Sequence, residues 1–120
     1  PQASRRTLTE LIFANIHTEL EALEKEMGLQ GRTEGRHSIA QARIALNRMT
    51  LGKQNYLQTG LEPSLVPFYK GRTQLEQHLW QLDKLAKGMN RGREKSHGIY
   101  RIFALVNKWL VYVAHREINL

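Results

Sequence analysis

Residues 98–118 read GIYRIFALVNKWLVYVAHREI, and their conformation decides whether the chain is entirely helical. As a helix that begins near Ser96, the segment places its large apolar side chains on one face and its charged side chains on the other. The apolar face is Ile99, Ile102, Phe103, Val106, Trp109, Leu110 and Val113. The opposite face is Arg101, Lys108 and His115. The length of the segment and its uniformly polar second face favour the helix.

The same segment also fits a β-hairpin, so a second fold stays open. Residues 99–106 and 109–114 are rich in β-branched and aromatic side chains, with Asn107 and Lys108 as the turn between them. As a hairpin, the segment resembles the Tyr-Arg strand of RelE/ParE-type toxins through Tyr100 and Arg101, although residues 1–60 contain no counterpart of that fold's first strand. The alternative fold is therefore three helices followed by a C-terminal β-hairpin.

The clearest helix of the chain lies near its start. Its apolar residues recur at three- and four-residue steps, which is the spacing of one helix face. These residues are Leu8, Leu11, Ile12, Ile16, Leu20, Leu23 and Met27. Thr7 and Glu10 fit a capping box at the start of this helix, and Gly28 followed by Leu29 fits a left-handed stop at its end.

Two further helices are predicted in the middle of the chain. The second helix follows a glycine-containing loop at residues 30–37 and runs from Ser38 to Gly60. Gly52 lies inside it and indicates either a bend or a close contact with another helix. The third helix follows the linker 62–67, which contains two prolines. Pro67 can be the first residue of this helix, because a proline is tolerated at that position.

Four amphipathic segments with short connections predict an all-α fold, an antiparallel four-helix bundle that forms a single domain over residues 1–120. The chain lacks cysteine, which excludes disulfides, Cys-ligated zinc and a thiolate nucleophile. No stretch approaches the roughly 20 uninterrupted apolar residues that a membrane span needs. We therefore expect a cytoplasmic protein without a membrane partner.

The net charge of +7 at pH 7 is distributed unevenly along the chain. Residues 1–30 carry three basic and five acidic side chains, a net charge of −2. The other residues carry 15 basic and six acidic side chains, a net charge of +9. Such an excess of positive charge favours an anionic partner. The cations gather at a loop and at helix ends rather than opposite a bulky apolar face, which favours DNA or RNA over a lipid surface.

Two clusters of basic residues supply most of this excess. The denser cluster surrounds a loop predicted at residues 88–96 and consists of Lys84, Lys87, Arg91, Arg93, Lys95 and Arg101. The sparser cluster consists of Arg32, Arg36, Arg43, Arg48 and Lys53. In an antiparallel bundle the loops 30–37 and 88–96 lie at the same end, so the clusters are predicted to form one basic pole that contacts phosphates. Other roles remain open: Lys84 and Lys87 also suit the helix macrodipole, and Arg43 can pair with glutamates of the first helix.

These features predict a small nucleic-acid-binding accessory protein that contacts mainly the phosphate backbone. Its architecture resembles that of accessory proteins carried by phages, plasmids and other mobile elements. Trp80 and Trp109 are expected in the core and Tyr100 at its edge, so no aromatic ladder for a single strand is expected. The five histidines lack metal-ligand spacing and no catalytic motif is complete, so neither a metal or other cofactor nor an enzyme activity is expected.

The second hypothesis is a helical interaction module. The first helix has a dense acidic edge from Glu19 to Glu26. This edge can meet the basic regions of a neighbouring copy, which gives a homo-oligomer. The two functions are compatible, because an oligomer multiplies the basic poles.

The third hypothesis is a ribonuclease or toxin-like enzyme. Residues 91–97 read RGREKSH, and they resemble the Arg…His arrangement of small helical ribonucleases of the HEPN type. The resemblance implies that His97 is a general base while an arginine stabilises a phosphorane-like state. In that family the pair lies within a helix, whereas the glycines here predict a loop.

Overall fold

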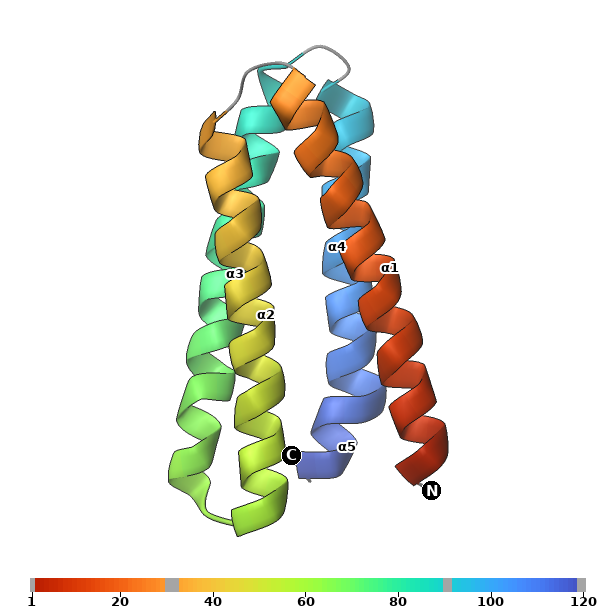
Figure 1. The fold of residues 1–120 in the computed structure, drawn as a ribbon, viewed down its shortest axis with the longest axis vertical. Coiled ribbons are helices and arrows are strands. Elements are labelled where there is room, and N and C mark those ends of the chain that lie inside the picture. Colours follow the sequence, from red (N-terminus) through yellow and green to blue (C-terminus); the bar gives the residue numbers. More distant parts are fainter. Residues whose placement is uncertain (1, 30–32, 90–91, 119–120) are drawn as a thin grey trace.

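Four long helices run up and down in the computed structural model, which describes residues 2–29, 33–89 and 92–118 (Figure 1). They are α1 (Gln2–Leu29), α2 (Thr33–Thr59), α3 (Val66–Lys87) and α4 (Gly92–Trp109). A 3₁₀ turn, η1 (Glu62–Leu65), precedes α3, and a π-helical turn, η2 (Leu110–Ala114), with the short α5 (His115–Ile118) continues α4. The all-α prediction is confirmed.

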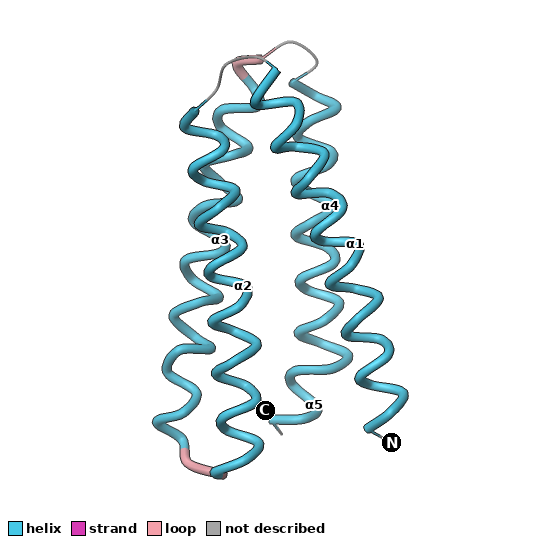
Figure 2. Tube along the Cα trace, viewed as in Figure 1, coloured by secondary structure: helices cyan, strands magenta, loops and turns pink. Residues whose placement is uncertain are grey.

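The alternative prediction of a C-terminal β-hairpin is wrong. Figure 2 shows helix and no strand over residues 98–118. A helix buries the apolar face that the spacing predicted: Ile99, Ile102 and Trp109 are fully buried. This burial outweighs the β propensity of individual residues. Val106 is buried in α4, whereas Val111 and Val113 fall in the π-helical turn, where Val111 is exposed. The side chains of Val113 and His115 lie outside the described residues.

Three helix boundaries differ from those predicted. α1 begins at Gln2, so Thr7 lies within the helix and does not cap it. α2 begins at Thr33 rather than Ser38, and α4 begins at Gly92 rather than near Ser96, so most of both predicted loops is helical. The loop prediction for residues 30–37 is wrong at Gly35, because this glycine permits two helices to pack closely instead of forming a turn. A Cβ on Gly35 would lie 2.5 Å from the sulfur of Met27, so the first turn of α2 packs directly on α1.

The ends of α2 and α3 agree with the sequence. Gly60 adopts a left-handed conformation with φ of 68°, and its N–H donates to the carbonyl oxygen of Tyr56 at 2.7 Å. This geometry ends α2 as a glycine after a helix often does. Gly28, in contrast, does not adopt the predicted left-handed conformation and continues α1 to Leu29.

The closest helix pair is α2 and α3, which cross at two glycines. A Cβ on Gly52 would lie 2.7 Å from the backbone nitrogen of Phe68, and a Cβ on Gly71 would lie 2.8 Å from the carbonyl oxygen of Ala45. Only a residue without a side chain permits this approach. Of the two roles predicted for Gly52, the close helix contact is therefore confirmed.

The helices form a ring in which each packs on its two neighbours, so α4 contacts both α3 and α1. The molecule measures 46 × 26 × 18 Å, and its long axis follows the helices. The core inside the ring includes the fully buried Ile16, Leu46, Phe68, Leu79 and Trp109. Among the helices of the described residues, none is both long and apolar enough to cross a membrane.

Candidate nucleic-acid interface

The two connections predicted to form a basic pole lie at the same end of the bundle. α1 and α3 end there, and α2 and α4 begin there (Figure 1). The topological part of the prediction is therefore confirmed. The predicted phosphate-binding residues are the six of the denser cluster with Arg32, Arg36 and Arg43 of the sparser one. Of these nine, Arg32 and Arg91 lie outside the described residues, so the structure describes seven.

Three of these seven cations pair with glutamates of α1. The guanidinium of Arg43 on α2 donates to Glu24 at 2.7 Å. The ammonium of Lys95 on α4 lies 3.7 Å from a carboxylate oxygen of Glu26, and Lys95 is only 6% exposed. Lys95 is buried because α4 begins earlier than predicted. This places Lys95 one turn before the buried Ile99 on the same helix face.

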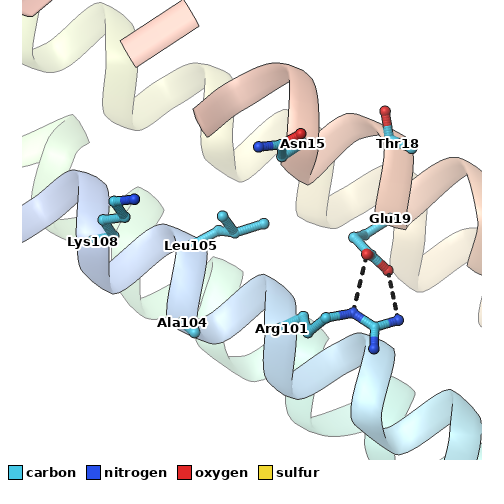
Figure 3. Close-up of a pocket in the computed structure, with 7 residues that line it drawn as sticks. All are labelled: Asn15, Thr18, Glu19, Arg101, Ala104, Leu105 and Lys108. Carbon is cyan, nitrogen blue, oxygen red and sulfur yellow. Dashed lines mark hydrogen bonds and ion pairs between the residues drawn. The ribbon is translucent and has the colours of Figure 1, made fainter. Parts of the chain in front are cut away.

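Arg101 forms the third of these pairs, in the groove between α1 and α4 (Figure 3). Its Nε and one terminal nitrogen donate to the two carboxylate oxygens of Glu19, at 3.1 and 3.3 Å. This two-bonded fork fixes the guanidinium against α1. The groove has a volume of about 390 Å³, and Lys108 lies at its far end. Arg101 therefore joins two helices of the bundle, and its role in phosphate binding stays a prediction.

Two other cations of the sparser cluster are also engaged away from the pole. Lys53 is buried, and its ammonium lies 2.6 Å from Glu117 of α5. Arg48 is exposed and donates to the side-chain oxygen of Gln74 on α3 at 2.8 Å. The sparser cluster therefore acts mainly within the bundle.

Lys87 is exposed but pairs with a buried carboxylate. Its ammonium lies 3.0 Å from one oxygen of Asp83, whose side chain is 3% exposed. Asp83 raises the pKa of Lys87, first by accepting its hydrogen bond and then through its charge, and Tyr100 on α4 adds a smaller electrostatic contribution. The other oxygen of Asp83 has no hydrogen-bond partner among the described residues, so Lys87 is its main compensation.

Three predicted phosphate-binding residues remain exposed without an ion-pair partner among the described residues. They are Arg36 on α2, Lys84 on α3 and Arg93 on α4. Arg93 lies in the first turn of α4, where the backbone N–H groups add partial positive charge. Glu94, also exposed, is the acidic neighbour at this position. These three cations are available to an external anion.

Two of these cations share a surface with exposed aromatic rings. On α3, the exposed Trp80, Lys84 and Lys87 follow one another at steps of four and three residues, so they lie on one helix face. On α4, the exposed Arg93, His97 and Tyr100 repeat this spacing. α3 and α4 are antiparallel neighbours, and the two rows meet at the rings of Trp80 and Tyr100. We call these six residues the α3–α4 face. Lys84 also lines a hollow between α3 and α2, beside His37 and Ser38.

The aromatic rings lie at one end of this face. Trp80 is 54% exposed and Tyr100 is 44% exposed, and their ring centroids are 6.4 Å apart at an interplanar angle of 72°. Trp80 also packs against Phe103, with ring centroids 4.9 Å apart. The prediction of a core position is thus confirmed for Trp109 and wrong for Trp80. Tyr100 occupies the predicted edge position.

The exposure of Trp80 follows from its register on α3. Trp80 is one residue beyond the buried Leu79, a rotation of about 100° that moves it off the apolar stripe. The residues one turn away in either direction, Glu76 and Lys84, are polar and exposed. The helical wheel therefore indicated an exposed position, although Trp80 was expected in the core.

The histidine of the enzyme hypothesis also lies on the α3–α4 face. His97 is exposed on α4, one turn after Arg93, so the segment 92–97 is helical and the predicted loop is wrong. No group of three or more His, Asp or Glu side chains that could hold a metal ion occurs in the part of the chain that was described.

A comparison of this chain with protein-family models, curated proteins and solved structures found no match. The function proposed below therefore follows from the geometry and charge of the α3–α4 face.

Proposed function

We propose that this chain is a small nucleic-acid-binding protein that contacts the phosphate backbone through the α3–α4 face. The observation that carries the proposal is the pair of exposed cations, Lys84 and Arg93, which share the α3–α4 face with exposed aromatic rings and are not engaged by carboxylates of the described chain. Cations held by α1 stabilise the bundle, whereas these two are positioned to bind an external anion.

The electrostatics of this end support the proposal. The chain carries a net charge of +7, and α1 uses Glu19, Glu24 and Glu26 to bind cations of other helices. The first turn of α4 adds the positive end of a helix dipole beside Arg93. Arg36 on α2 extends the exposed positive charge around the same end of the bundle. A polyanion is the complementary partner for such a surface.

We expect the double variant Lys84→Glu/Arg93→Glu to lose at least about 100-fold in affinity for nucleic acid, because hydrogen bonds to charged groups each contribute about 1.5–3 kcal/mol. Its salt dependence should also become shallower, by about 0.7 in the log–log slope for each phosphate of a single strand that the variant no longer neutralises. Lys87 is left unchanged because it compensates the buried Asp83. Fluorescence anisotropy of a labelled oligonucleotide, measured over a salt series, checks both expectations.

The matched control is Lys70→Glu/Lys108→Glu. It changes the net charge equally, and its two lysines are exposed on the same two helices but outside the α3–α4 face. We expect this control to bind several-fold more weakly at most, and both variants to keep the helical circular dichroism spectrum. Equal losses in the two variants would show that net charge, rather than this face, determines binding.

The proposal includes the process in which such a protein acts. A cytoplasmic accessory role, of the kind found on phages, plasmids and other mobile elements, suits a small basic protein that contacts phosphates. Self-association is compatible with it, although three glutamates of the acidic edge already pair within the chain. Sedimentation of the purified protein with and without nucleic acid measures both association states.

A further inference from the structure

We propose that Trp80 and Tyr100 stack on unpaired bases, so that the partner of the α3–α4 face is single-stranded nucleic acid. This inference rests on the proposed function and deepens it, because it names the form of nucleic acid that the face selects. It uses two rings that phosphate binding alone leaves without a role.

An aromatic cluster on this face is exposed to water. Trp80, Tyr100 and Phe103 form contiguous ring contacts across α3 and α4, yet Trp80 remains 54% exposed. The other tryptophan of the chain, Trp109, is fully buried. Exposing a large indole ring is unfavourable unless a partner covers it. The packing on Phe103 holds the Trp80 ring in place, which reduces the ordering that binding requires.

Positive charge extends from the rings along both helices. A rise of 1.5 Å per residue places Lys84 about 6 Å and Lys87 about 10 Å along α3 from Trp80. On α4, the cation Arg93 lies two turns before Tyr100. Rings at one end of a face offer a stacking surface for one or two bases, and the cations along the face can contact the phosphates that follow them. An apolar protein partner would leave these cations without counter-charges.

The double helix is a poorer partner for these rings than a single strand. In a duplex the faces of the bases are stacked on one another, and side chains reach only the base edges and the phosphates. Stacking on Trp80 or Tyr100 therefore requires a base that has left its own stack. A single strand supplies such bases at low cost, and both DNA and RNA provide them.

The test compares four probes: oligothymidylate, oligouridylate, a duplex of the same length, and a strand of the same length with abasic sites. The abasic strand keeps the phosphates and removes the stacking surface. We expect each stacked base to raise affinity by about 5- to 150-fold over the abasic strand, since base–aromatic stacking is worth about 1–3 kcal/mol and 1.36 kcal/mol is tenfold. Oligothymidylate and oligouridylate should each also bind more tightly than the duplex.

Three variants of aromatic residues separate stacking from charge. Trp80→Leu keeps apolar packing against Phe103 and should lose the advantage of bases over abasic sites, whereas Trp80→Phe should retain part of it. Tyr69→Leu is the matched control, because Tyr69 is 43% exposed on α3 but lies about three turns from Trp80, outside the α3–α4 face. Tryptophan fluorescence gives an independent readout, since a strand can quench the exposed Trp80 but not the buried Trp109.

The outcomes distinguish the inference from the function on which it rests. If duplex and abasic strand bind as tightly as oligothymidylate and Trp80→Leu changes nothing, while Lys84→Glu/Arg93→Glu abolishes binding, the function stands and the stacking inference is wrong. If no probe binds the wild type, the function and the inference both fail. A dimer that Trp80→Leu dissociates, without affinity for any probe, would assign the rings to a second copy and overturn the inference.

Discussion

Replacing Glu117 with glutamine is expected to lower the free energy of unfolding by about 3–5 kcal/mol, the largest effect of any single substitution outside the core. Glu117 on α5 lies 2.6 Å from the ammonium of Lys53 on α2, and the side chain of Lys53 is only 8% exposed. The ammonium also lies 5.6 Å from the ring centroid of Trp109. The glutamine amide oxygen can still accept a hydrogen bond, but it carries no charge, so the buried ammonium would lose its counter-charge.

Chemical denaturation followed by circular dichroism measures this effect. The matched control is Glu76→Gln, which alters an exposed ion pair with Arg72 and should change stability by less than about 1 kcal/mol. The double variant Lys53→Met/Glu117→Leu removes both charges and should recover most of the loss, because apolar replacements of a buried pair are often neutral. A loss below about 1 kcal/mol for Glu117→Gln would show that the pair behaves like one on the surface.

Gly71→Ala is expected to destabilise the protein by about 1–3 kcal/mol, although alanine is intrinsically better than glycine in a helix by about 1 kcal/mol. The added Cβ would lie 2.8 Å from the carbonyl oxygen of Ala45 and 3.1 Å from the backbone nitrogen of Met49. Both atoms belong to the backbone of α2, so relief requires the two helices to separate. Thermal or urea unfolding measures the loss.

Gly98→Ala provides a control of opposite sign. Gly98 lies in α4, and an added Cβ there would meet its nearest atom, an oxygen of Glu19, at 3.6 Å, which is an ordinary contact. Helix propensity should therefore dominate and raise stability by up to about 1 kcal/mol. If Gly71→Ala also raised stability, the close crossing of α2 and α3 would not be required for the fold.

The sequence predicted the fold class because apolar periodicity is a property of each helix by itself. The length of residues 98–118 and the polar face opposite Ile99, Ile102, Val106 and Trp109 favoured a helix over a hairpin, and these four apolar residues are buried. The boundaries were less predictable because glycine has two uses. Gly35 was interpreted as part of a loop, but it lies at a contact with Met27 that only the packed bundle reveals.

The candidate site was predicted in part. Charge density indicated the end of the bundle where the exposed Lys84 and Arg93 lie, but it did not distinguish these two residues from Lys95 and Arg101, which bind α1. That distinction depends on which glutamate lies opposite each cation, a tertiary property. The exposure of Trp80 was not predicted, for a different reason. Its position on the helix indicated exposure, but its large ring was expected in the core.

The groove in Figure 3 has a consequence for the order in which the bundle assembles. Helices that follow one another meet across short connections, so closing their contacts costs little chain entropy. α1 and α4 meet only after most of the chain has folded back, and Glu19 and Arg101 are 82 residues apart. The contacts between α1 and α4 are therefore expected to form late, because non-local contacts are slow to close. We expect the contact between these two helices to be the last part of the ring to form.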